Sequence, residues 1–517
     1  MRLSKLTLSL CAMGMTCWIG SARAQAFFDS ATYPHGSLGL PLGVAGDVDR
    51  DGDIDLITNP VRPASQNPQY PFGLWINDGD GNFAEETALR VSSTTNPWRL
   101  GNPVLADLDL DGDLDVVYGG FDLLVGSHQV VRIWINDGSG NFRDASSTLA
   151  PKTQFSAIED LVVADLDGDR FPDIVVATAY DVATPGQLCT VFMNTRQGSF
   201  KDETSSRVPS TRASRVRVAD CDSDGDVDLL FYTKGPFSFL LNDGRGYFKP
   251  SQKSFGVSFT AHVILDDFNG DRHVDALVFH LHFDHLWIND GTGTFKNEAS
   301  LRLPKPTGYT GTVGVVGDFN ADGHLDIFGH VHGDSGPTYP GHYNLMMNDG
   351  KGYFRLIEAV LPQTPVLVTA GGFAADIDGD DDDDYIDNVV RFPLVGNTVM
   401  RKNLWREIHS KAPPKLGQPY GIDTYTGQTP AVLLPFLSLG RSRLPLAGVG
   451  TFRLDLATTV ALGAYPLDKP GGVQVPLPIP NDNALIGLPL STQAAVIDTK
   501  ALRVTGFTNA RTEKIEK

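Results

Sequence analysis

The sequence predicts an all-β protein: a seven-bladed β-propeller over residues 27–411, followed by a small β-sandwich over residues 412–517. Three observations support this prediction. An acidic loop motif recurs seven times at intervals of 47 to 60 residues, a hairpin motif follows six of these loops, and no stretch shows a long helical periodicity. A unit of four antiparallel strands repeated in this way is typical of a propeller blade.

The first 26 residues have the pattern of a secretory signal peptide. Arg2 and Lys5 precede an apolar stretch, and small residues follow it, so we expect cleavage after Ala24 or after Ala26. No other stretch is long and apolar enough to span a bilayer. The sequence therefore predicts export without membrane insertion, to the extracellular space, the periplasm or the cell surface.

Composition narrows the classes of partner. The formal net charge is −20, and no basic stripe exists that could neutralise phosphates, which argues against nucleic acids and anionic membranes. Cys189 and Cys221 are the cysteines that remain after the signal segment, and whether they pair stays open. We expect a monomer.

The acidic loop first appears in residues 46–59, which read GDVDRDGDIDLITN. Carboxylates this close repel one another, so a cation among them would explain the pattern. Counted from the first aspartate, positions 1, 3, 5 and 9 are Asp or Asn in six loops, and glycine falls at position 4 or 6. Oxygen ligands at these positions, with a backbone carbonyl at position 7, form the opening of a calcium loop.

In chain order, the predicted ligands of the first six loops are Asp47, Asp49, Asp51, Asp53 and Asp55; Asp107, Asp109, Asp111, Asp113 and Asp115; Asp165, Asp167, Asp169, Phe171 and Asp173; Asp220, Asp222, Asp224, Asp226 and Asp228; Asp267, Asn269, Asp271, His273 and Asp275; and Asp318, Asn320, Asp322, His324 and Asp326. Position 8 is apolar in all six, which suits an anchor in the blade core.

The seventh loop, ADIDGDDDDD at 375–384, departs from this pattern because Asp383 occupies position 8. Its predicted ligands are Asp376, Asp378 and Asp380, with position 9 filled either by Asp384 or, after a three-residue insertion, by Asp387. The apolar register slightly favours Asp387. We expect up to seven Ca²⁺ ions, one per blade, because Mg²⁺ needs stricter geometry and Zn²⁺ prefers sulfur and imidazole.

The second recurring motif is an Asn-Asp-Gly turn between apolar runs, a strong hairpin signal. It reads LWINDGDGNF at 74–83 and returns in four further units, and a variant without Asp-Gly, VFMNTRQGSF, stands at 191–200; all six segments end in Phe at the start of an outer strand. No such outer strand follows the seventh loop. Residues 27–32, FFDSAT, resemble the other outer strands, so we expect them to complete the seventh blade and close the ring.

These loops and hairpins resemble FG-GAP and VCBS repeats, the blade type of the integrin α-subunit propeller, over residues 27–410. The resemblance implies a seven-bladed propeller with Ca²⁺ in the loops between first and second strands. It says little about activity, because such blades occur in adhesins, lectins and some lyases.

The composition changes near residue 412. PPKLGQPYG is typical of a linker, and the alternating runs that follow it predict a small β-sandwich without a catalytic constellation. This part resembles a C-terminal module of secreted repeat proteins from some environmental bacteria.

Two classes of function fit the sequence. The first is a secreted, calcium-dependent binding or adhesion protein for glycans or surface proteins; the alternative is a secreted polysaccharide-acting lyase or hydrolase. Either would use the variable loops opposite the calcium loops, at 60–72, 88–103, 118–130, 178–189 and 333–343. Histidines near this face could form a metal or acid–base site, or line the central channel: His280, His282, His285, His330 and His332.

Overall fold

The structure is a computed structural model. It describes residues 31–34, 43–58, 70–79, 81–93, 98–100, 103–122, 129–178, 188–196, 199–232, 237–253, 255, 260–280, 284–304, 309–320, 322–333, 342–357, 369–379, 382–391, 395–401, 408–410, 414–426, 431–439, 441–446, 450–467, 471–500, 503–508 and 510–517. The predicted signal peptide and the predicted ligand Asp380 lie outside these residues.

The described residues up to Arg401 form antiparallel sheets of four or five strands. The strands of the first four sheets are β2 (Val44–Gly46), β3 (Asp55–Thr58), β4 (Gly73–Asn77) and β5 (Phe83–Glu85); β6 (Trp98–Leu100), β7 (Val104–Ala106), β8 (Asp115–Asp122), β9 (Gln129–Ile135) and β10 (Arg143–Asp144); β11 (Ile158–Ala164), β12 (Asp173–Thr178), β13 (Thr190–Asn194) and β14 (Phe200–Asp202); and β15 (Arg215–Ala219), β16 (Asp228–Tyr232), β17 (Ser238–Leu241) and β18 (Lys249–Pro250).

The strands of the next three sheets are β19 (Thr260–Asp266), β20 (Asp275–His280), β21 (His285–Asn289) and β22 (Phe295–Asn297); β23 (Tyr309–Gly317), β24 (Asp326–Gly333), β25 (His342–Asn348) and β26 (Phe354–Ile357); and β27 (Thr369–Ala375), β28 (Asp384–Arg391), β29 (Val395–Arg401) and β1 (Ala31–Pro34). One-turn helices follow three outer strands: α2 (Thr87–Arg90), α3 (Thr204–Arg207) and α4 (Ala299–Arg302).

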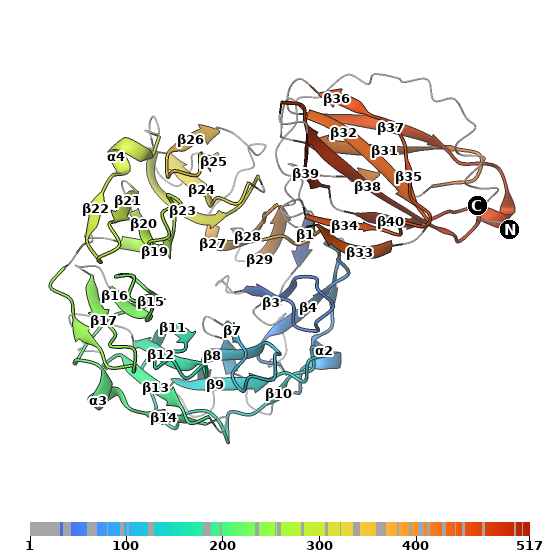
Figure 1. Cartoon of the computed structure of the whole chain (residues 1–517). Coiled ribbons are helices and arrows are strands. Elements are labelled where there is room, and N and C mark those ends of the chain that lie inside the picture. The colour runs from blue at the N-terminus through green and yellow to red at the C-terminus, as the bar shows by residue number, and fades with distance from the viewer. Residues whose placement is uncertain are drawn as a thin grey trace.

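These sheets are arranged in a ring (Figure 1). Most sequential strands within a sheet pair as neighbours, and the second strands β3, β12 and β16 are buried along their whole length. Adjacent sheets pack face to face. Val175 and Val191 of one sheet, for example, share a core with Val216 and Leu229 of the next. The predicted all-β propeller architecture is confirmed; that the seven sheets found among the described residues are all of the blades stays a prediction.

The N-terminal strand lies at the outer edge of the last sheet. β1 pairs antiparallel with β29, with Ala31 opposite Met400 and Pro34 opposite Asn397. The first described strand of the chain therefore forms the outer strand of the last sheet in the ring. The segment predicted to do this, residues 27–32, overlaps β1 at Ala31 and Thr32.

The C-terminal part is a β-sandwich. Its strands are β30 (Ile408–Ser410), β31 (Pro419–Thr426), β32 (Ala431–Ser438), β33 (Arg441–Leu446), β34 (Gly450–Leu454), β35 (Val460–Ala461), β36 (Tyr465–Leu467), β37 (Gly471–Pro478), β38 (Pro489–Asp498), β39 (Arg503–Phe507) and β40 (Arg511–Lys514), with a 3₁₀ turn η1 (Asn483–Leu485). A three-stranded sheet, β30-β31-β37, packs on a six-stranded sheet around β32 and β38, with Ile422, Leu433 and Val475 in the shared core. The C-terminal sheets begin at β30, ahead of the predicted boundary at 412.

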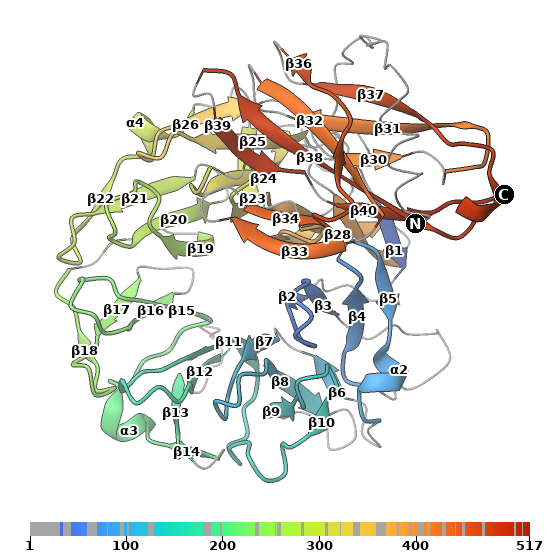
Figure 2. The same ribbon diagram turned by 45° about the vertical axis from the view of Figure 1, so that its right-hand side comes forward.

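β33 and β34 form a separate hairpin on the other face of the six-stranded sheet. Phe452 and Leu454 of β34 share a core with Ala495 of β38 and Phe507 of β39. Figures 1 and 2 both place this hairpin next to β28 and β1 of the ring. It therefore lies between the sandwich and the propeller.

No helix in the described part of the chain has the length and apolarity needed to cross a membrane. Cys189 and Cys221 are both buried free thiols.

Candidate metal centres

Each acidic loop joins the first and second strands of one sheet. Position 9 begins the second strand, opposite the residue that precedes position 1: Gly46 pairs with Asp55, and Ala164 pairs with Asp173. Since the register is the same in every sheet, the loops lie on one end of the ring.

The seventh loop uses Asp384 at position 9. Ala375 pairs with Asp384, and the Ile377 N–H donates to Asp384 Oδ2 at 3.1 Å, as Val48 N–H does to Asp55 Oδ2 in the first loop. The preference for Asp387 is wrong, because Asp387 pairs with Gly372 within the β27–β28 ladder. No insertion interrupts the loop.

Asp383 explains why the seventh loop departs from an apolar position 8. Its Oδ2 accepts from the Asp318 N–H at 2.7 Å, and its own N–H donates to the Asp318 carbonyl at 3.0 Å. Burial raises the pKa of Asp383 to about 6. Asp383 therefore joins the sixth and seventh loops, whereas the apolar residues at position 8 of the other loops suit an anchor in the core of their own blade.

The position 9 carboxylates brace the loops. Asp55 accepts the Val48 N–H at one oxygen and the Asn77 N–H, 2.9 Å away, at the other. Burial raises the pKa of Asp55 to about 7 in spite of these two donors. The same shift to about 7 holds for Asp115, Asp173, Asp228 and Asp275, and Asp326 rises to about 8.

Positions 1, 5, 6 and 7 hold the turn together. Asp47 Oδ2 accepts the Gly52 N–H at 3.0 Å, and Asp51 Oδ1 accepts the Asp53 N–H at 3.0 Å. The same two bonds recur in the other five regular loops; the third loop, for instance, uses Asp165 with Arg170 and Asp169 with Phe171. The motif thus encodes one loop conformation.

Glycine alternates between positions 4 and 6 because both need a positive φ. In the first loop Arg50 has φ 61° and Gly52 φ 92°, whereas in the third loop Gly168 has φ 74° and Arg170 φ 79°. Either arrangement places one glycine and one non-glycine residue in the left-handed region. The two sequence variants therefore build the same turn.

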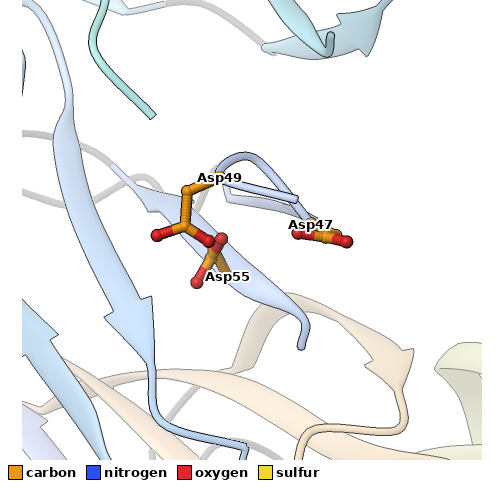
Figure 3. A group of neighbouring side chains, drawn as sticks. All are labelled: Asp47, Asp49 and Asp55. Atoms are coloured by element: carbon orange, nitrogen blue, oxygen red, sulfur yellow. The ribbon is translucent and has the colours of Figure 1, made fainter. Parts of the chain in front are cut away.

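The loops bring carboxylates together. In five loops, three aspartates each offer an oxygen, and these oxygens lie within 4.8 Å of one another. Figure 3 shows the first such group, Asp47, Asp49 and Asp55. The other groups among the described residues are Asp107, Asp109 and Asp111; Asp165, Asp167 and Asp173; Asp220, Asp222 and Asp228; and Asp376, Asp378 and Asp384. The fifth and sixth loops have the amides Asn269 and Asn320 at position 3.

Several of these oxygens are buried without a hydrogen-bond donor. At positions 1 and 3 they are Asp47 Oδ1, Asp49 Oδ1, Asp107 Oδ1, Asp167 Oδ1, Asp222 Oδ1 and the amide oxygen Asn320 Oδ1, and Asp326 Oδ2 at position 9 is another. An unsatisfied buried oxygen costs free energy, and several like charges side by side cost more. Burial, then repulsion from the position 5 carboxylate, raises the pKa of Asp49 and Asp222. These residues fit a bound cation.

The hairpin glycines allow neighbouring sheets to approach the loops. A Cβ at Gly138, the first hairpin glycine of the second sheet, would overlap the Asp113 carboxylate of its own loop. A Cβ at Gly140, the second one, would lie 3.3 Å from the Asp49 Cβ of the preceding loop. Each hairpin is therefore wedged between two acidic loops.

The hairpin asparagine has a role that the turn signal did not predict. Asn136 is buried, and its Nδ2 donates to the Leu114 carbonyl of its own loop at 3.2 Å and to the Val48 carbonyl of the preceding loop at 2.7 Å. Five further asparagines make the same pair of bonds: Asn77, Asn194, Asn242, Asn289 and Asn348. The available sequence signal was that Asn recurs as the first residue of all six hairpin turns, including the third, where Thr195 and Arg196 follow it in place of Asp-Gly.

Arginines from the short helices reach the same region. Arg90 of α2 forms an ion pair with Asp49 at 3.4 Å, and Arg207 of α3 lies 3.8 Å from Asp167. Both also donate to a hairpin carbonyl of the next sheet, at Ser139 and Arg245 respectively. These cations offset part of the charge that the acidic loops concentrate.

The histidine cluster is only partly described. His282 lies outside the described residues, as do most of the variable loops opposite the acidic loops. The His285 Nδ1 lies 2.8 Å from Asn297 Nδ2 in the neighbouring strand. The predicted site at these histidines stays a prediction.

Comparison with known families gives a consistent result. The chain matches the FG-GAP-like repeat family over residues 47–118, 119–176 and 267–329. These segments contain acidic loops and hairpins of the kind described above.

The chain is also similar to curated proteins. It is 29% identical over 170 residues to cartilage acidic protein 1 of Homo sapiens, covering 32% of this chain and 24% of that protein. It is 23% identical over 248 residues to a T-cell immunomodulatory protein homolog of Plasmodium yoelii yoelii, covering 45% of this chain and 33% of the relative. The chain thus spans about a quarter to a third of the length of these relatives.

Among solved structures, an Agrocybe aegerita lectin described as recognising non-reducing terminal N-acetylglucosamine aligns with a TM-score of 0.45 and 18% identity, over 66% of this chain and 91% of the lectin. AofleA from Arthrobotrys oligospora aligns with a TM-score of 0.35 and 11% identity, over 65% of this chain and 90% of that one. Similarity at this level carries no information about ligands. The repeat match, together with the loops and hairpins that produce it, shows that this chain contains FG-GAP-like repeats in these three segments.

Proposed function

We propose that this protein is a secreted, calcium-loaded β-propeller that binds an extracellular glycan or protein. The observation that carries the proposal is the set of buried aspartate oxygens at positions 1 and 3 that lack a hydrogen-bond donor. A cation in each loop would satisfy them and would remove the repulsion between neighbouring carboxylates.

The donor set favours Ca²⁺ over other metals. Every predicted ligand is a carboxylate, amide or backbone oxygen, the type that hard cations prefer. Ca²⁺ accepts six to eight such ligands in flexible geometry, whereas Mg²⁺ demands a near-ideal octahedron and keeps several waters. Asp47, Asp49, Asp51 and Asp55 would hold the ion in the first loop, together with the Asp53 carbonyl, and the equivalent residues would do so in the other loops.

Binding is the activity that such a scaffold supports. The ions would rigidify one end of the ring, and loops that vary between blades would then present the ligand-binding surface. The acidic charge of the chain argues for an uncharged or basic ligand, and secretion rests on the N-terminal segment.

A glycan array probed with the purified, fluorescently labelled mature chain tests the proposal. We expect binding to a restricted set of glycans in Ca²⁺ and its loss in EGTA. A parallel pull-down from an extracellular protein fraction, in Ca²⁺ and in EGTA, covers the protein class of ligand. If the folded, calcium-loaded protein binds nothing in the glycan array and nothing in the pull-down, the binding function is contradicted.

A further inference from the structure

A buried arginine of the C-terminal sandwich lies among the acidic loops of the propeller. Arg453 is only 8% exposed, and its Nη1 lies 3.6 Å from Asp53 Oδ1 of the first loop. A Cβ at Gly379 of the seventh loop would overlap its guanidinium group. Arg453 therefore contacts both loops that meet where the ring closes.

The sandwich holds this arginine firmly from its own side. Phe452 and Leu454 face the core, so Arg453, between them on β34, faces the opposite way. Its backbone N–H donates to the Oε1 of the buried Gln493 at 2.8 Å. Its Nε has no hydrogen-bond partner in the described structure. A buried guanidinium needs nearby negative charge, and the acidic loops supply it.

Other junctions in the ring show what this arginine replaces. At two junctions the position 4 side chain of one loop contacts the position 7 side chain of the next: Arg50 lies 2.6 Å from Asp113, and Ser223 Oγ lies 2.8 Å from His273 Nδ1. The third and fifth loops have glycine at position 4, as the seventh does. At the junction between the last and first blades, position 4 is Gly379, which has no side chain, and position 7 is Asp53. Arg453 contacts Asp53 in the place that a position 4 side chain would take.

We propose that the C-terminal sandwich is a latch for the propeller: it docks across the junction between the first and last blades, and Arg453 supplies the interloop contact that the seventh loop lacks. The C-terminal domain of the same chain is thus the partner that covers the first and seventh acidic loops. The two parts stabilise each other, so that disturbing either side of the contact loosens the other. This proposal does not depend on the identity of the bound metal or of the ligand.

Hydrogen–deuterium exchange on the full-length, calcium-loaded protein tests the latch from the sandwich side. We expect Arg453→Gln to accelerate exchange at least tenfold in peptides covering residues 47–58 and 382–391. Peptides covering 165–178 in the third blade should exchange as in the wild type. The matched control is Arg503→Gln, which removes an exposed arginine of β39 and should change neither region. If the Arg453→Gln variant is folded and residues 47–58 and 382–391 both exchange at the wild-type rate, the proposal is overturned.

A second pair of variants tests the contact from the propeller side, should Arg453→Gln fail to fold. Gly379→Ala and Gly168→Ala introduce the same strain, because both glycines occupy position 4 with φ 74°. Only at Gly379 would the new methyl group displace the arginine, since at Gly168 the nearest atom is 3.7 Å away. We expect faster exchange in residues 441–454 of the sandwich for Gly379→Ala alone. Equal exchange there in the two variants would show that the sandwich does not sense the seventh loop.

Discussion

Asn77 donates a hydrogen bond of 2.7 Å from its Nδ2 to the backbone carbonyl of Ile377, 300 residues further along the chain. The same Nδ2 donates to the Ile54 carbonyl of its own loop at 3.0 Å. Asn77 is 3% exposed, and its bond to Ile377 is buried while its bond to Ile54 is partly buried. The hairpin asparagines of the second to sixth blades make the same bond to the loop of the preceding blade. Asn77 therefore joins the first blade to the seventh loop in the same way.

Replacing Asn77 with alanine should destabilise the ring. The substitution leaves the buried Ile377 carbonyl and the partly buried Ile54 carbonyl without their donor, and an unsatisfied buried group costs about 1–3 kcal/mol. We expect the free energy of unfolding in urea to fall by about 3 kcal/mol. The control is Asn82→Ala in the same hairpin, where the side chain is exposed and bonds only to Asp78 among the contacts described. Equal midpoints for the two variants would show that the interblade bond contributes nothing.

Removing calcium should destabilise the protein. Without the ion, five of the loops keep three carboxylates whose oxygens lie within 4.8 Å of one another. A ligand that binds only the folded state adds about 2.7 kcal/mol per site at a hundredfold excess over its Kd. We therefore expect EGTA to lower the melting temperature by several degrees, Ca²⁺ to restore it and Mg²⁺ to restore it poorly. Identical melting curves with and without EGTA would mean that the loops are solvated turns.

Substitutions at Asp222 should separate loss of an ion from weaker binding. Asp222→Ala removes an oxygen that is buried without a donor, so titration calorimetry should show about one Ca²⁺ ion fewer. Asp222→Asn keeps an oxygen, as Asn269 and Asn320 do at the same position, so the number of ions should stay the same while affinity falls. Asp243→Ala, in the exposed hairpin turn, is the acidic control. An unchanged ion count in Asp222→Ala would remove this residue from the ligand set.

The pH dependence of stability should reverse on adding calcium. In the metal-free protein, burial raises the folded-state pKa of Asp55 and Asp173 from 3.8 to about 7. The folded state then binds more protons than the unfolded state between these values, so stability is present at acidic pH and is lost as the pH rises through about 7. With Ca²⁺ bound to the ionised carboxylates, protons compete with the ion, so stability should fall as the pH falls.

Thermal melting at a series of pH values, in EGTA and in Ca²⁺, measures both trends. We expect the melting temperature in EGTA to decrease from pH 5 to pH 8, and the benefit of Ca²⁺ to increase over the same range. A benefit of Ca²⁺ that does not change with pH would show that the position 9 carboxylates take no part in binding the ion.

Losing the N-terminal strand should open the last sheet. β1 pairs along β29 from Ala31 to Pro34, so a chain that begins after Pro34 leaves the edge of β29 without its partner. We expect a lower melting temperature and stronger aggregation than for the chain that begins at residue 27. A synthetic peptide of residues 27–36 should restore part of the stability by pairing with the free edge. A truncated chain that melts like the longer one would contradict this closure.

The repeating features of this protein could be predicted from the sequence because they are local. An aspartate loop, an Asn-Asp-Gly turn and the apolar runs between them each specify a turn or a strand over a few residues, and their repetition specifies the sheets. The role of the N-terminal strand could be predicted for the same reason, because the seventh blade had no outer strand of its own and residues 27–32 resemble one. The predicted segment nevertheless ended before Tyr33 and Pro34, because strand ends depend on pairing with β29.

Contacts between distant parts of the chain were decided by the tertiary structure alone. The choice of Asp384 over Asp387 depends on the register of β28 against β27, and the apolar pattern of one strand does not determine this register. The bond from Asn77 to Ile377 exists because closing the ring makes the first and last blades neighbours. Arg453 lies beside Asp53 because a separate domain docks there, so its partner is set by the position of that domain and not by any sequence spacing.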